Sequence, residues 1–129
     1  MGAKHVINPD QLTLFERAGD LADPTKFYPG DAGPAMANYY SGYSYGEIRD
    51  ILREDKLDDA HHSGLYKSIE ESGVKEPVRV SRLPTNYKDH LEEEVGFRSS
   101  RGMLEDGHHR TYSQADIDPD AWVPVRWGG

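Results

Sequence analysis

Hydrophobic and polar positions change period several times along this 129-residue chain, and each change marks an expected element. Near the N-terminus, "HVI" predicts a short strand. Asn8 is a suitable cap for a helix that begins at the following proline, and Leu14, Ala18 and Leu21 would share one face of that helix. The pattern therefore predicts a helix over 9–21.

Residues 22–43 are rich in Gly, Pro, Asp and Tyr and show neither helical nor strand periodicity, which predicts a long ordered loop. Five tyrosines lie between positions 28 and 45. Tyrosines in this arrangement can stack on bases, but in such loops they more often pack over the edge of a core. Packing is the favoured interpretation here.

The clearest helix signal follows this stretch. Ser44 and Glu47 form an S-x-x-E capping box before "EIRDILREDKL". In that segment Ile48, Ile51 and Leu52 make a narrow apolar stripe among charged residues, which is typical of a helix with one buried face.

A second helix is expected directly after the first. Ser63 is a candidate cap for "GLYKSIEES", in which Leu65 and Ile69 face inward at a spacing of four residues. Gly73 is well placed to end this helix, because glycine readily adopts the left-handed conformation found after helix C-termini.

Three strands are expected in the rest of the chain. "EPVRVSRL" alternates valines with arginines, and its proline suits the first position of a strand or an edge strand. The apolar segment "RGMLE" and the bulky segment "WVPVRW" predict two more strands. We expect a mixed α+β fold in a single domain over 1–129, with an N-terminal part at 1–43, a core at 44–127 and a polar insertion at 84–100.

Composition narrows the possible function. The chain has no cysteine, which excludes disulfide scaffolds, zinc–thiolate sites and cysteine nucleophiles and suits a reducing compartment. No apolar run approaches the roughly 20 residues that cross a bilayer, so a cytoplasmic protein without membrane association is expected. The formal charge of −8 disfavours a general DNA-coating protein, although a local backbone site can still bind a phosphate.

The candidate site lies in "LEDGHHRTYSQA", residues 104–115. Asp106 is expected to cap a helix that begins near His108, and Gly107 would form the tight turn into it. Free amide groups at such a helix start, together with the helix dipole, can bind an anion. Arg110, one turn further, would add a charge-assisted contact to the same phosphate, and His108 and His109 would donate further hydrogen bonds.

Two other interpretations of this stretch remain open. The pairs His61-His62 and His108-His109 suggest a metal, but adjacent helical side chains diverge by about 100°. A site would therefore need His61 or His62 to approach from elsewhere, joined by carboxylates such as Asp106 or Glu105. In the simplest interpretation, Asp106 only caps the helix and both histidines are half-exposed.

Taken in order, "LYKSIEESGVKEPVRV", "MLEDGHHRTYSQA" and "WVPVRW" resemble the ParB/sulfiredoxin superfamily, in particular its ParB-like nuclease domains. The resemblance covers residues 60–127, about half the chain, and "QLTLFERAGDL" is similar to a segment of small phage-encoded ParB-like proteins. The matching positions are those of a helix, a strand, a [DE]-G-x-x-R turn and a closing strand: Leu65, Ser68, Ile69 and Gly73; Pro77, Val78 and Val80; Asp106, Gly107 and Arg110; Val123 to Arg126.

The resemblance implies a compact ParB/sulfiredoxin-like fold, with a small mixed sheet and flanking helices, that binds CTP, ATP or ADP phosphates, with Mg²⁺ where hydrolysis occurs. The implied phosphate contacts are Gly107, His108, His109 and Arg110, with Ser68 near the site. The N-P-x-Q-P-R box and the helix-turn-helix domain of chromosome-segregation ParB proteins are not visible here. Sulfiredoxin chemistry needs a cysteine in the same turn, which this chain lacks.

Two functions follow as hypotheses. In the first, the turn holds a nucleotide or nucleic-acid phosphate, His108, His109 or Glu105 acts as a general base, and Asp106 binds a metal for phosphodiester or phosphoanhydride hydrolysis. Phosphoryl transfer to a small hydroxyl substrate is a less favoured variant. In the second, the chain is a non-catalytic acidic module that binds a host or phage protein, with "HLEEEV" and "REDKLDD" as candidate contact faces.

Overall fold

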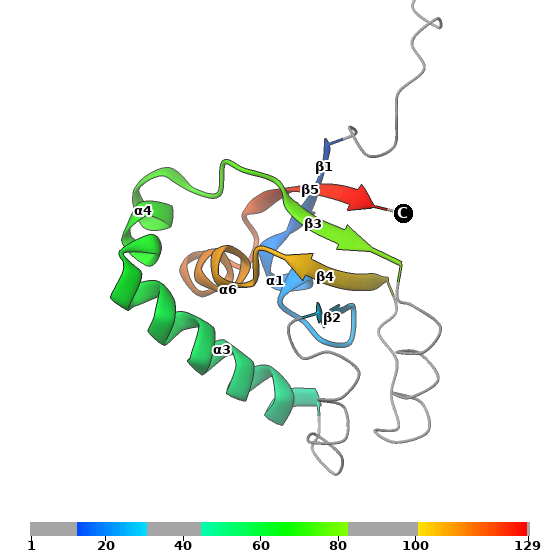
Figure 1. The fold of residues 1–129 in the computed structure, drawn as a ribbon, viewed down its shortest axis with the longest axis horizontal. Helices are drawn as coiled ribbons and strands as arrows, with labels where there is room; N and C mark the ends of the chain where they lie inside the picture. The colour runs from blue at the N-terminus through cyan, green and yellow to red at the C-terminus, as the bar shows by residue number, and fades with distance from the viewer. Residues whose placement is uncertain (1–12, 31–44, 83–100, 129) are drawn as a thin grey trace, which may run out of the picture.

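The computed structural model describes residues 13–30, 45–82 and 101–128, and all statements about structure concern these ranges (Figure 1). They form a mixed α+β fold, as the sequence predicts. In chain order the elements are β1 (Thr13–Arg17), α1 (Ala18–Leu21), β2 (Phe27–Pro29), α3 (Tyr45–Ser63), α4 (Leu65–Ser72), β3 (Val78–Ser81), β4 (Gly102–Asp106), α6 (His108–Ile117) and β5 (Trp122–Gly128).

The described strands form one mixed sheet in the order β1-β5-β3-β4-β2. β1 pairs antiparallel with β5, and β3 pairs antiparallel with β4. The pairs β3–β5 and β2–β4 are parallel. α6 packs against α1, α3 and α4 and lies between the sheet and α3, so it is the central helix of the fold (Figure 1).

Alternation along the central strands separates the two faces of the sheet. Val78 and Val80 on β3 and Val123 and Val125 on β5 are fully buried, and they belong to one core cluster with Leu104. Burying side chains of this size contributes about 1.5–3 kcal/mol each. The strands predicted at "VRVS", "GMLE" and "WVPVRW" are therefore confirmed, and the valines of β3 and β5 decide which face meets the helices.

The helix predicted over 9–21 is wrong for residues 13–17, which form strand β1, and only Ala18–Leu21 is helical. Leu14 and Phe15 are both exposed, so the apolar spacing does not define a buried helical face. β5 offers an unpaired backbone edge, and pairing with it satisfies the polar groups of 13–17. Asn8 and "HVI" lie outside the described residues.

The loop predicted over 22–43 contains a strand that the pattern does not reveal. β2 is three residues long, too short for alternation to be visible, and it pairs with β4. Tyr28, in this strand, is buried, in agreement with the packing interpretation for that tyrosine. The tyrosines within 31–44 and the insertion at 84–100 lie outside the described residues.

The two helices predicted after the tyrosine-rich stretch, α3 and α4, are confirmed, but one predicted cap is wrong. The N-cap of α4 is Gly64, in the left-handed conformation, and not Ser63. The Ser63 hydroxyl instead accepts a hydrogen bond from the Leu65 amide at 3.4 Å. Gly73 ends α4 as predicted, and Ser44 lies outside the described residues.

Candidate functional site

The predicted strand–glycine–helix turn is present. β4 ends at Asp106, Gly107 has φ of +94°, and α6 begins at His108. The Thr111 amide donates to the Gly107 carbonyl at 2.9 Å and closes the first turn of α6. The amides that precede Thr111 point out of the helix start, where the positive end of the helix dipole lies.

Asp106 does not cap α6, so that prediction is wrong. No side-chain cap is present at this helix start, because the left-handed Gly107 is the N-cap residue and Asp106 is still part of the strand. The Asp106 carboxylate is exposed, and its Oδ2 lies 3.8 Å from Nη2 of Arg110. It is therefore available for a role other than capping.

The Arg110 guanidinium lies against the glycine turn. Its Nη1 donates to the Glu76 carbonyl at 3.0 Å, which ties the segment before β3 to the start of α6. Its Nη2 lies 3.0 Å from the position that a Cβ on Gly107 would occupy. Five N–H donors are available on a guanidinium, so these contacts leave donors for a ligand. Arg110 thus has a structural role and keeps donors for a ligand, while the carboxylates of Asp106 and Glu76 lie 3.8 and 4.0 Å from its guanidinium.

A hollow of about 570 Å³ adjoins this turn. The end of α3 and the start of α4 form its other wall. Its lining residues are Asp59, Ser63, Leu65, Asp106, Gly107, His108, His109 and Arg110. Sequence reasoning missed Asp59 and Ser63, because no local pattern relates the end of α3 to a turn some 50 positions later.

The two histidines differ in exposure, as their divergence on a helix predicts. His109 is part-exposed, and its Nε2 lies 3.3 Å from Oδ2 of Asp59. A carboxylate at this distance orients the ring and favours one tautomer. His108 lines the same hollow but is only 3% exposed. The expectation of two half-exposed histidines is thus met by His109 alone.

Two predicted site residues lie outside the hollow. The Glu105 carboxylate points toward the end of β5, where its Oε2 lies 3.9 Å from the position of a Cβ on Gly128. Ser68 is exposed on α4 and does not line the hollow. The structure therefore places five predicted site residues around one hollow and Glu105 and Ser68 outside it; the five are Asp106, Gly107, His108, His109 and Arg110.

A hydrogen bond joins the helices beside the hollow. The Tyr66 hydroxyl donates to Oδ2 of Asp116 at 2.6 Å, and the Arg53 guanidinium pairs with the same carboxylate. This hydrogen bond, with burial as a smaller cause, raises the pKa of Tyr66 to about 12. The Tyr66 hydrogen bond, followed by Arg53, lowers the pKa of Asp116 below its usual value. α3, α4 and α6 are thereby held together at one carboxylate.

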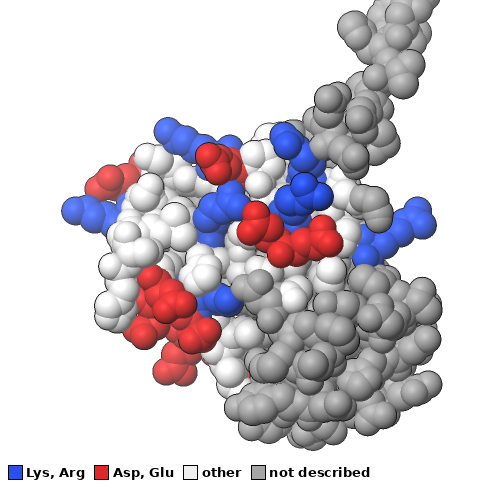
Figure 2. Space-filling view, in the orientation of Figure 1, with Lys and Arg blue, Asp and Glu red and all other residues white. Residues whose placement is uncertain are grey.

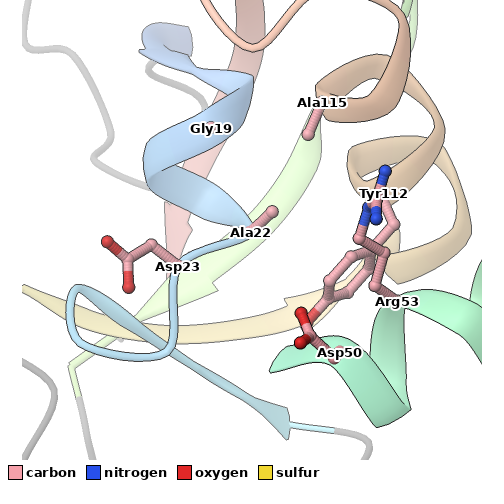
Figure 3. Close-up of a pocket in the computed structure, with 7 residues that line it drawn as sticks. All are labelled: Gly19, Ala22, Asp23, Asp50, Arg53, Tyr112 and Ala115. Carbon is pink, nitrogen blue, oxygen red and sulfur yellow. The ribbon is translucent and has the colours of Figure 1, made fainter. Parts of the chain in front are cut away.

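A second cavity, of about 320 Å³, lies between α1, α3 and α6 (Figure 3). Asp50 and Arg53 on α3 lie beside Tyr112 of α6, and Asp23 comes from the segment after α1 (Figure 3). Gly19, Ala22 and Ala115 complete the lining. Neither His109 nor Arg110 lines this cavity, so it is separate from the turn.

In the three described ranges, no group of three or more His, Asp or Glu side chains is arranged to hold a metal ion. Within the same ranges, no helix is long and apolar enough to cross a membrane.

Comparison with known proteins finds no protein-family model, no curated protein and no solved structure that matches this chain. The resemblance to the ParB/sulfiredoxin superfamily therefore remains a prediction from the motifs.

Proposed function

We propose that the chain binds a nucleotide or nucleic-acid phosphate at the Gly107–Arg110 turn and, with Mg²⁺, hydrolyses a phosphoester or nucleotide phosphate bond. The observation that carries this proposal is the position of Arg110, whose guanidinium lies on the glycine turn at the edge of the hollow. Outward amides and a fixed guanidinium supply donors for a phosphate. The ParB-like motif supports the same assignment.

His109 is the preferred general base in this proposal. It lines the hollow, it is partly exposed, and Asp59 orients its ring. A base must reach the proton of the attacking water, directly or through one water, and His109 is better placed for that than the buried His108 or the distant Glu105.

In this proposal Asp59 and Asp106 are the ligands of the magnesium ion, because they are the two carboxylate residues among those that line the hollow. Both carboxylates are exposed and line the hollow. Proteins commonly hold Mg²⁺ with one or two carboxylates while substrate phosphates and water complete its shell, so a larger cluster is not required. When bound, the ion would neutralise charge on the phosphate. Without it the two carboxylates oppose an anion, so binding is expected to depend on Mg²⁺.

Titration calorimetry with CTP, ATP and ADP, each with and without Mg²⁺, tests the site. Arg110→Ala should weaken binding about 10- to 150-fold, the value of a hydrogen-bonded charge. Arg82→Ala, which removes an exposed arginine outside the hollow, is the matched control and should leave binding unchanged. Unchanged affinity in Arg110→Ala, or no binding by the wild type, would contradict the proposal.

Product analysis separates hydrolysis from binding. Nucleotides and single- and double-stranded DNA are incubated with the wild type and with His109→Gln, which removes the base. Turnover that falls at least about 100-fold in His109→Gln supports general-base catalysis. Bound nucleotide without turnover in the wild type would remove the hydrolytic part and keep the binding part.

A specific observation favours the second candidate, an acidic interaction module. Exposed carboxylates gather along α3, where Asp50, Glu54, Asp55, Asp58 and Asp59 all face solvent (Figure 2). Such a surface suits a basic partner. If neither the wild type nor Arg110→Ala binds nucleotide, this module becomes the better proposal. "HLEEEV", the other predicted contact face, lies outside the described residues.

A further inference from the structure

Two aromatic side chains are exposed on the sheet face opposite the core. Phe15 on β1 and Trp122 on β5 are each 58% exposed. They line a hollow of about 480 Å³ on that face. Exposed aromatic side chains of this size, placed together, usually mark a binding surface.

Two arginines lie side by side on the same face. Arg79 on β3 and Arg126 on β5 are register partners on neighbouring parallel strands, and both are exposed. Within the described ranges, neither side chain makes a hydrogen bond or an ion pair, although the Glu105 carboxylate of β4 lies near Arg79 beside Gly128. Like charges directly opposite each other destabilise a sheet, so an anion bound between them would stabilise it.

Arg17 fixes the exposed indole. Its guanidinium lies 4.4 Å from the centre of the Trp122 ring, and it donates to the Asp120 carbonyl at 2.9 Å. The ring is therefore held in one orientation while more than half of the residue remains exposed. A ring held in this way can stack on a planar ligand with little loss of side-chain entropy.

The charge on this face opposes the charge of the whole molecule. At the described positions of β1, β3 and β5 that share the face with Trp122, no acidic residue occurs, whereas the neighbouring strand β4 places the exposed Glu105 and Asp106 beside Arg79. Figure 2 shows basic side chains over β3 and β5, and acidic ones over α3 and near β4. The net charge of −8 therefore does not prevent an anion from approaching this face.

We propose that this face binds single-stranded nucleic acid, with bases stacked on Trp122 and Phe15 and phosphates held by Arg79 and Arg126. Four residues of strand separate Trp122 from Arg126, about 13 Å. Arg79 is also the register partner of Asp106, so the surface adjoins the Gly107 turn. The inference does not rest on the proposed hydrolysis, since it uses different residues.

Other occupants fit less well. Two aromatic side chains bury at most about 500 Å², below the roughly 800 Å² per partner of a stable dimer interface, and paired copies would bring arginines together. In a duplex, the bases are already stacked on each other and cannot stack on Trp122.

Fluorescence anisotropy of labelled oligothymidylate of about 12 nucleotides, a length that one such platform can bind, tests the inference. Trp122→Ala should weaken binding about 5- to 150-fold, and Trp122→Phe should retain most of it, because the ring still stacks. Replacing both Arg79 and Arg126 with Gln should lower the dependence of log affinity on log salt by about 1.4. Replacing the exposed Lys67 and Lys75 with Gln removes the same charge elsewhere on the molecule. This control should leave the dependence of log affinity on log salt unchanged.

Several results would overturn the inference. The inference fails if the wild type does not bind the oligonucleotide at low salt. It also fails if duplex binds with the same affinity as the single strand, or if Trp122→Ala binds the oligonucleotide as tightly as the wild type. A wild-type dimer that Trp122→Ala dissociates, without any effect on nucleic acid, would assign the face to self-association instead. Arg110→Ala should weaken mononucleotide binding about 10- to 150-fold and leave oligonucleotide binding unchanged, so this inference and the proposed function can fail separately.

Discussion

At the residue scale, Gly107 is required by two separate constraints. Its φ of +94° lies in the region that side chains rarely adopt. A Cβ at this position would also come within 2.5 Å of Cγ1 of Val78, a fully buried residue on β3. The glycine of the motif therefore has a packing reason that is independent of any phosphate, and the turn would keep its shape without a ligand.

Gly107→Ala should lower the free energy of unfolding by about 2–4 kcal/mol, the sum of backbone strain and overpacking. Gly64→Ala is the matched control. Gly64 has a φ of +82° but nothing within 4 Å of the added Cβ, so the loss should be about 1 kcal/mol. Urea unfolding measures both. Equal losses would show that contact with Val78 does not matter.

At the scale of elements, the packing of α3, α4 and α6 depends on contacts between side chains. The sequence pattern did not predict these contacts. Tyr66 on α4 and Arg53 on α3 both bind Asp116 on α6. The hydrogen bond keeps Tyr66 protonated and Asp116 ionised. Its contribution to stability is therefore largest between the two pKa values and declines on either side.

Tyr66→Phe should lower the free energy of unfolding by about 1 kcal/mol between about pH 5 and pH 9. Unfolded tyrosine ionises near pH 10 and folded Tyr66 at about 12, so the wild type loses this stability as the pH rises from 10 to 12. The folded pKa of Asp116 is below the usual 3.8, so the contribution also disappears as acid protonates it.

Urea unfolding over a pH series measures the difference between wild type and Tyr66→Phe. Asp116→Asn, introduced into both proteins, is the control, because it should remove most of the difference. A difference that stays constant into the alkaline range would show that Tyr66 does not donate to Asp116 in solution.

At the scale of the whole molecule, Arg101 connects distant parts of the sheet. It precedes β4, and its guanidinium donates to Glu16 of β1 at 2.6 Å, although β1 and β4 are not neighbours in the sheet. It also lies over the Phe27 ring, 5.5 Å from its centre. These contacts indicate that the sheet curves around its core, as twisted sheets do.

Arg101→Ala should lower the free energy of unfolding by about 1–2 kcal/mol, because it leaves the largely buried Glu16 carboxylate without this charged donor. Thermal unfolding by circular dichroism measures the loss. Arg82→Ala serves as the exposed control and should change stability by less than about 0.5 kcal/mol. If the two variants melt alike, the link between β1 and β4 contributes nothing to stability.

The candidate site was partly predictable. The glycine turn, the helix that begins at His108 and the proximity of Arg110 follow from one continuous segment, and all are present. Asp59 was not predictable as the partner of His109, since it belongs to another helix. The cap assigned to Asp106 failed because Gly107 takes the N-cap position itself.

The sequence by itself determined the elements whose signal is local: α3, α4, β3, β5 and the turn before α6, where periodicity and glycine placement act within a few residues. Only the tertiary structure decided that 13–17 and 27–29 are strands, because each gains its hydrogen bonds from a distant strand. The same reason applies to function. Aligned strands bring Arg79 beside Arg126, and packed helices bring Asp59 to His109, because register and packing join positions that are remote along the chain.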